Sequence, residues 1–219
     1  MLTDARGVIA GLDLEASGTW LGCRVEPGVL VAGLLNRRAV DPDAPVRTGS
    51  RSRGLLCLDA LRSGSVADVV AGLTESSIAE YGPFNLLLAD RERAVVVDNG
   101  DGIRCTELEA GMSVLTNLDV NDPRCPRLAS AVPSFEQVAD LLAGDVSLEV
   151  LVSSLAEVLS SHFNSLDPAD RNPLARVCIH GPEYGTRSSS IIALEQTGRV
   201  HYHHADGPPC TTPFQPVRY

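Results

Sequence analysis

Apolar segments typical of strands and of helices gather in separate blocks along this chain, and this arrangement limits the fold class more than any other feature. Short apolar runs of strand length occupy residues 29–35, 84–89, 94–98, 112–117, 175–180, 189–195 and 199–204. Apolar residues at helical spacing occupy 52–61, 66–73, 134–143 and 147–161, with Ser134 and Gln137 as a capping box. Because strands and helices do not alternate one for one, the pattern predicts an α+β fold with antiparallel sheets.

The length and composition predict one domain over residues 1–219. Hydrophobic residues make up 44% of the chain and aromatic residues only 4%, so the core is expected to be aliphatic and tightly packed. No repeat, linker or low-complexity tract divides the sequence.

The charge composition excludes several classes of function. The net charge of −10 argues against nucleic acid or an anionic membrane as a general partner. All 18 basic residues are arginines, so chemistry that needs a lysine, such as a Schiff base or a P-loop, is excluded.

The cysteines and the hydropathy pattern predict a cytoplasmic protein that does not insert into a membrane. The six cysteines are scattered, none forms a C-x-x-C pair, and most lie in apolar contexts such as Val177-Cys178-Ile179, where a thiol packs as a small hydrophobe. No leader is visible at residues 1–12, and no apolar run approaches the roughly 20 residues that span a bilayer.

Several predicted strands end on polar side chains. Asn36 and the Thr116-Asn117 pair end apolar runs, and the Thr186-Arg187 pair lies in a turn that leads into one. Convergent strand ends would place their donors around one carboxylate or oxyanion. The alternative for each Asn is a turn, whose dihedral angles Asn tolerates. Trp20, between two glycines, is either a core anchor or the wall of a pocket.

The histidines do not predict a metal site. His201 and His203 share a face of the last strand, but the sequence places no acidic or thiol partner beside them, so no metal is expected. Cys125-Pro126 predicts either a turn or the start of a helix between Pro123 and Arg127.

Matching stretches in a fixed order make this chain resemble the NRDE family, which includes the transport and Golgi organisation 2 proteins. The resemblance covers nearly the whole chain. The stretches are 11–13 and 17–22, 31–36 (Val-Ala-Gly-Leu-Leu-Asn), 51–54 (Arg-Ser-Arg-Gly), 82–86 (Gly-Pro-Phe-Asn-Leu) with Asp90, 115–117 (Leu-Thr-Asn) and 184–187 (Tyr-Gly-Thr-Arg).

The resemblance implies a fold of the N-terminal nucleophile hydrolase type, a four-layer αββα sandwich. It implies cleavage of a C–N amide bond in a small molecule, with Asn117 donating to the oxyanion and Arg187 holding a substrate carboxylate or amine. The residues expected to line the substrate site are Thr19, Trp20, Asn36, Asn85 and Thr186.

The resemblance equally implies the alternative of a haem or lipid binding and trafficking protein. The expected ligands for haem are Cys125, His180 and His201, without an order of preference. No other cofactor is expected.

The chain departs from the family pattern at its start. Family members open with Met-Cys, whose cysteine would be the nucleophile, and carry Asn-Arg-Asp-Glu before the Gly-Thr-Trp segment. Here Leu2 follows Met1, and Asn36-Arg37-Arg38 comes after Trp20. Either the start codon is misassigned or this is a short form; the chain as given is therefore expected to lack an N-terminal strand and to be inactive.

Overall fold

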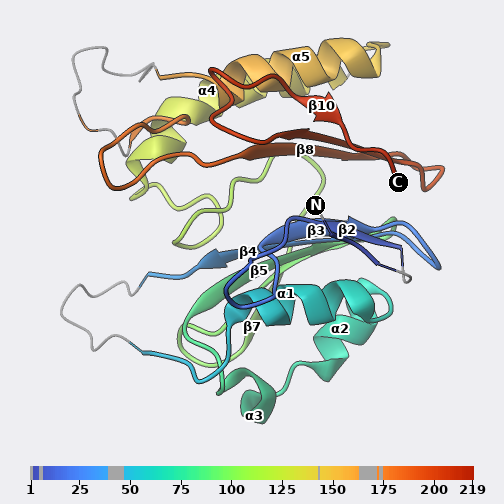
Figure 1. The fold of residues 1–219 in the computed structure, drawn as a ribbon, viewed down its shortest axis with the longest axis vertical. Coiled ribbons are helices and arrows are strands. Elements are labelled where there is room, and N and C mark those ends of the chain that lie inside the picture. The colour runs from blue at the N-terminus through green and yellow to red at the C-terminus, as the bar shows by residue number, and fades with distance from the viewer. Residues whose placement is uncertain (1, 5–6, 39–46, 143, 163–171, 173–174) are drawn as a thin grey trace.

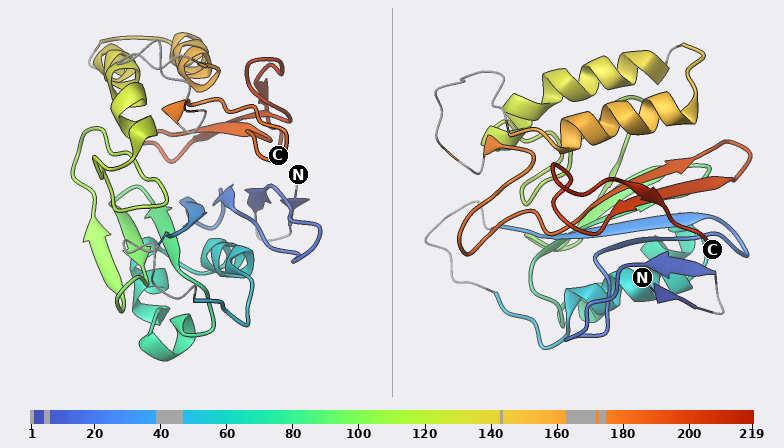
Figure 2. Two further views of the ribbon diagram at one scale, coloured as in Figure 1. Left: turned by 90° about the vertical axis from the view of Figure 1, so that its left-hand side faces the viewer. Right: turned by 45° about the horizontal axis from the view of Figure 1, so that its top comes forward.

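The computed structural model describes residues 2–4, 7–38, 47–142, 144–162, 172 and 175–219, and these form four layers in the order αββα (Figures 1 and 2). Helices α1–α3 cover one face of a seven-stranded sheet with strand order β1 to β7. A three-stranded sheet, order β10-β9-β8, lies on its other face, and α4 and α5 cover that smaller sheet. The predicted α+β sandwich is confirmed.

The elements have the following bounds. The large sheet contains β1 (Leu2–Thr3), β2 (Val8–Ala10), β3 (Leu21–Arg24), β4 (Leu30–Asn36), β5 (Phe84–Ala89), β6 (Ala94–Asp98) and β7 (Arg104–Glu107). The small sheet contains β8 (Ser189–Leu194), β9 (Val200–Ala205) and β10 (Gln215–Pro216). The helices are α1 (Arg53–Arg62), α2 (Val66–Gly72), α3 (Glu75–Ile78), α4 (Pro126–Leu142) and α5 (Leu148–Leu159).

Alternation along β4, β5 and β6 gives the large sheet two different faces. Leu34 pairs with Leu86, which pairs with Val97, and these side chains are buried against α1 and α2 in the main core. Because neighbouring residues of a strand point to opposite faces, Asn85 and Asp98, paired with each other, lie on the face away from the helices, where Asn85 contacts Thr116 and Leu118. In β4 to β6, the register thus directs Leu34, Leu86 and Val97 to the helices and Asn85 and Asp98 to the opposite face.

The contact between the two sheets is smaller. Ile9 and Cys23 of the large sheet pack against Val200 and Tyr202 of β9, with partly buried residues such as Ile192 around them. This cluster has four buried members, whereas the helix-side core of the large sheet has nineteen. Most of the packed interior therefore lies in the lower half of the molecule, which is the large sheet with α1–α3 (Figure 1). The small sheet with α4 and α5 forms the upper half.

The helical layer over the small sheet is loosely packed. Helix α5 reads LEVLVSSLAEVL, yet none of its residues is fully buried, and Leu142 at the end of α4 is largely exposed. Among the described residues, no helix combines the length and the hydropathy needed to cross a bilayer.

Three details differ from the sequence prediction. Residues 112–117 and 175–180 are irregular instead of extended, and Ser134 lies inside α4, so it caps nothing. In and after the first of these segments, the backbone carbonyls of Thr116 and Leu118 accept hydrogen bonds from the side chain of Asn85 and not from a neighbouring strand. Of the two alternatives predicted at Cys125-Pro126, the structure has the helix start: α4 begins at Pro126 and therefore runs past the position of Ser134.

Arg24 joins the large sheet to the end of α1. Its buried guanidinium donates to the carbonyls of Gly28 (2.9 Å), Leu61 (3.1 Å), Ser63 and Gly64 (2.6 Å). Burial lowers the pKa of this arginine. A cation at a helix C-terminus is favoured by the helix dipole and satisfies carbonyls that the helix leaves free.

We expect Arg24→Met to lower the free energy of unfolding by about 2–4 kcal/mol, because the buried Leu61 carbonyl and three part-buried carbonyls would lose their donor. Arg62→Met is the matched control: Arg62 forms a solvent-facing ion pair with Asp4 at 3.1 Å, worth about 1 kcal/mol or less. Urea unfolding of both variants measures the difference. Equal losses would show that Arg24 does not join the two elements.

Candidate functional site

Two arginines and two aspartates form a charged group on the inner face of the large sheet. Arg37 follows β4 directly, Asp98 ends β6, and Arg104 begins β7. The antiparallel register places Asp98 opposite Arg104. Asp119, from the irregular segment after β7, completes the group.

The group is held by alternating ion pairs. Arg37 Nε lies 3.4 Å from Asp98 Oδ1 and its Nη2 lies 2.7 Å from Asp119 Oδ1. Arg104 Nε donates to Asp98 Oδ2 at 2.8 Å, and its Nη2 also contacts Asp119. Arg37 and Asp98 are only 8% and 5% exposed, so each carries a desolvation cost that its partners must offset.

These contacts shift the pKa values of two members. The Arg37 guanidinium, followed by Arg104, holds the pKa of Asp119 below its usual range. The hydrogen bond to Asp98 raises the pKa of Arg104. Asp119 and Arg104 therefore stay charged at neutral pH, and the ion pairs of the group neutralise one another.

A small pocket of about 200 Å³ opens at this group. It is lined by Arg37, Asn85, Val96, Asp98, Arg104, Thr106, Leu115, Asp119 and Val120. Its volume suits a few atoms of a polar ligand, such as a carboxylate, and not a whole substrate. The arginines could donate to such an oxygen only by giving up part of their present ion pairs.

The three predicted asparagines gather beside this pocket. Asn85 is fully buried: its Oδ1 accepts from Arg37 at 3.0 Å, and its Nδ2 donates to Thr116 and Leu118. Asn117 Nδ2 donates to the carbonyl of Asn36 at 2.6 Å, and the Asn117 carbonyl accepts from Arg38 N. Asn117 thus holds the end of β4, and its amide is engaged with the backbone.

The other predicted residues lie elsewhere. Thr19 is buried, and its hydroxyl donates to Leu21 O at 3.1 Å, while Trp20 is partly exposed. Thr186 pairs with Ile179 through its backbone N (2.9 Å) and its hydroxyl (3.0 Å). Arg187 is exposed and, among the described residues, forms no hydrogen bond or ion pair. The structure therefore brings the asparagines together but records no contact that adds Thr186 or Arg187 to them.

A much larger cavity, of about 1100 Å³, lies between α4, α5 and the small sheet. Its walls are mainly aliphatic, from Val138, Leu151, Leu155 and Ile192 among others, with Phe135 from α4. His201 and Glu195 lie at its polar edge, where His201 Nε2 is 2.6 Å from Glu195 Oε1. This contact holds the pKa of the Glu195 carboxyl below its usual value.

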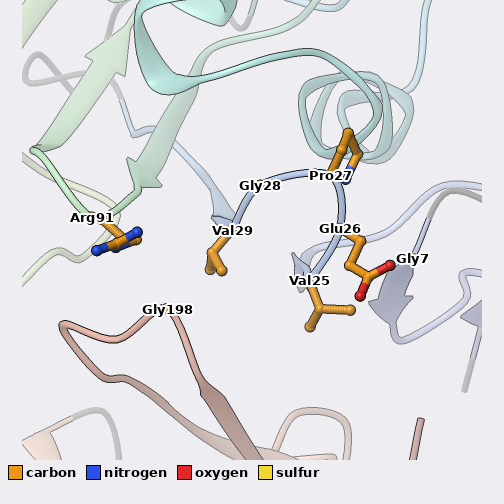
Figure 3. Close-up of a pocket in the computed structure, with 8 residues that line it drawn as sticks. All are labelled: Gly7, Val25, Glu26, Pro27, Gly28, Val29, Arg91 and Gly198. Atoms are coloured by element: carbon orange, nitrogen blue, oxygen red, sulfur yellow. The ribbon is translucent and has the colours of Figure 1, made fainter.

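A third, open pocket of about 610 Å³ lies where hairpin turns of the two sheets approach each other. Figure 3 shows Val25 and Val29 on the β3–β4 turn facing Gly198, with Glu26 and Arg91 at opposite ends. Gly198 has a φ of +89° at the β8–β9 turn, a conformation that favours glycine. Few polar groups converge here, so this pocket offers no evident chemistry.

The sequence pattern did not point to Arg37, Asp98, Arg104 or Asp119, because their pairing arises from strand register over long separations. Cys178 was expected to be a small hydrophobe, but it lies near His162, His180 and Cys210. The one signal in the sequence for this site is the polar character of the residues at the predicted strand ends.

We expect acid to destabilise the protein partly through Asp119. Its pKa is lowered by folding, so its contribution is present above the unfolded pKa of about 4 and is lost as the pH falls through the folded value. In Asp119→Asn, the urea midpoint should therefore fall less between about pH 5 and pH 2. Because Asp119 is 37% exposed, the effect should not exceed about 1 kcal/mol. Exposed Asp101→Asn is the control, and equal acid slopes for Asp119→Asn and the unsubstituted protein would contradict the assignment.

Comparison with known proteins agrees with the order of motifs. The family model for Transport and Golgi organisation 2 matches residues 1–206. The chain is similar to the mouse (Mus musculus) Transport and Golgi organization 2 homolog, with 28% identity over 223 residues, covering 89% of this chain and 75% of the mouse protein. The matched residues include β1 to β9 and helices α1 to α5, and the chain belongs to the Transport and Golgi organisation 2 family.

Proposed function

We propose that this chain binds an apolar small molecule, a lipid or haem, in the cavity between α4, α5 and the small sheet. The observation that carries the proposal is the cavity itself, about 1100 Å³ with mainly aliphatic walls. Typical small-molecule sites occupy about 300–1,000 Å³, so the space is sufficient for a long acyl chain or a tetrapyrrole.

The packing of α5 supports this proposal. Leu151 and Leu155 of α5 line the cavity, and no residue of this apolar helix is fully buried. Apolar side chains left partly exposed cost free energy that a bound apolar ligand would recover, at roughly 25 cal/mol per Å².

The polar edge of the cavity orders the expected haem ligands. His201 lines the cavity, whereas Cys125 and His180 do not belong to its walls. If haem is the occupant, His201 would be the residue that holds its iron, while the hydrogen bond from His201 Nε2 to Glu195 would orient the imidazole. For a fatty acid, the same edge would contact the polar head group.

We place this activity in the cytoplasm. All six cysteines are unpaired, which fits a reducing compartment.

Amide-bond hydrolysis is the second candidate, and the small charged pocket next to Asn85 is the observation that favours it. In this mechanism Asn117 would exchange its bond to the Asn36 carbonyl for a bond to the oxyanion. Arg187 would bind the substrate carboxylate or amine. We expect no amine release from acyl-amides by the chain as given; amine release that is lost in Asn117→Ala would favour hydrolysis over binding alone.

We expect Leu155→Trp to weaken ligand binding at least about ten-fold, because the indole would fill part of the cavity. Val150→Trp is the matched control on the same helix, since Val150 is 45% exposed and lies outside the cavity walls. Binding is measured with a fluorescent long-chain fatty acid and, separately, with hemin by its Soret band.

The two probes separate the two ligands. Loss of the Soret shift in His201→Ala, with fatty-acid binding retained, would assign haem to this cavity through His201. Saturable binding of the fatty acid alone would assign lipid. If neither probe binds saturably, or if both variants of α5 bind equally well, the proposal is wrong.

A further inference from the structure

Four metal-binding side chains from three distant segments meet at one place in the upper half of the molecule. His162 follows α5, Cys178 and His180 precede β8, and Cys210 follows β9. One ligand atom from each residue lies within 4.8 Å of the ligand atoms of the others. Among the described residues, this is the group of three or more His, Cys, Asp or Glu side chains that are close enough to share a metal ion.

The distances suit a tetrahedral ion. Cys178 Sγ is 3.7 Å from Cys210 Sγ, and His180 Nε2 is 3.1 Å from Cys210 Sγ and 3.8 Å from Cys178 Sγ. In tetrahedral zinc, with Zn–S bonds of about 2.3 Å and Zn–N bonds of about 2.0 Å, two sulfurs lie about 3.8 Å apart and sulfur and nitrogen about 3.5 Å apart. The two sulfurs are too far apart for a disulfide, which needs about 2.05 Å.

The second contact of His162 prepares it as a ligand. Its Nδ1 lies 3.0 Å from the carbonyl oxygen of Cys178, which can only accept, so Nδ1 carries the proton and donates. The lone pair is then on Nε2. A backbone carbonyl that fixes the tautomer in this way is the usual partner of a metal-bound histidine.

The backbone around the ligands is also fixed. Ile179, between Cys178 and His180, exchanges hydrogen bonds with Thr186, and Cys178 N donates to Ser161 O at 2.9 Å. A Cβ at Gly185 would lie 2.9 Å from the Ile179 carbonyl, so only glycine permits this approach without a shift. The Gly185-Thr186 pair thus positions the Cys178–His180 ligands.

We infer that His162, Cys178, His180 and Cys210 form a structural zinc site. A set of two thiolates and two imidazoles is the donor set that zinc prefers, and four protein ligands leave no open position for catalysis. The ion would join the end of α5 to the segments before β8 and after β9. These elements enclose the loosely packed cavity, so the metal would supply rigidity that side-chain packing does not.

The site is tested on the full chain, purified under reducing conditions. We expect about one zinc per chain by elemental analysis, and cobalt in its place should show the ligand-field and thiolate charge-transfer absorption of a tetrahedral site. Zinc should protect two of the six cysteines from thiol-modifying reagents, a readout that needs no variant. Removing the metal with a chelator should lower Tm by about 5 °C or more.

Cys210→Ser is the test variant because Cys210 is only partly buried, and exposed Cys105→Ser is the matched control. Cys210→Ser should bind zinc at least about ten-fold more weakly, and its Tm should no longer respond to the chelator. Cys105→Ser should behave as the unsubstituted protein. Absence of zinc binding, unchanged zinc affinity in Cys210→Ser, or a Cys178–Cys210 disulfide with no metal bound under reducing conditions would overturn the inference.

Discussion

The pairing of β4 with β5 determines the chemistry of both faces of the large sheet. With Leu34 opposite Leu86, aliphatic side chains meet α1 and α2, and Asn85 is directed to the opposite face. A slip by one residue would place Asn85 in the helix-side core without its partners Thr116 and Leu118, and would expose Leu86. The charged group also depends on this register, because Arg37 reaches Asn85 and Asp98 only when β4 ends beside β5.

The two halves of the molecule are stabilised differently. The large sheet and α1–α3 share an aliphatic core, to which Arg24 adds hydrogen bonds. The small sheet and α4–α5 enclose a large cavity, and α5 has no fully buried residue. The upper half therefore has room for a ligand, and a Cys₂His₂ cluster lies where its segments meet. Low packing density is costly in a structural element but useful in one that must admit an apolar molecule.

Much of the fold could be predicted from the sequence, because periodicity is a local signal. The strands at β5 and β6 and the helices α1 and α2 lie where the apolar spacing predicted them. The strand predicted at 112–117 is wrong. This segment is irregular, and the Thr116 carbonyl accepts from the side chain of Asn85, about thirty residues earlier in the chain. Such side-chain contacts leave no periodic mark in a sequence.

The candidate site was less predictable. Asn36, Asn85 and Asn117 are gathered, but Arg187 lies apart from their hydrogen-bond network in the described residues. The residues next to Cys178 in the sequence are apolar, and only the folded chain brings the side chains of His180 and Cys210 to its sulfur. Ligand sets built from separated segments need the tertiary structure to be seen.

The chain order of the large sheet has a consequence for how this protein assembles. Its strands β1 to β7 lie side by side in the order of synthesis, so each new strand can pair with the one that left the ribosome before it. The small sheet is completed only after residues 215–216 emerge, because β10 pairs with β9. We expect nascent chains to carry a folded lower half and an open upper half, which is the stage at which chaperones would find exposed apolar surface.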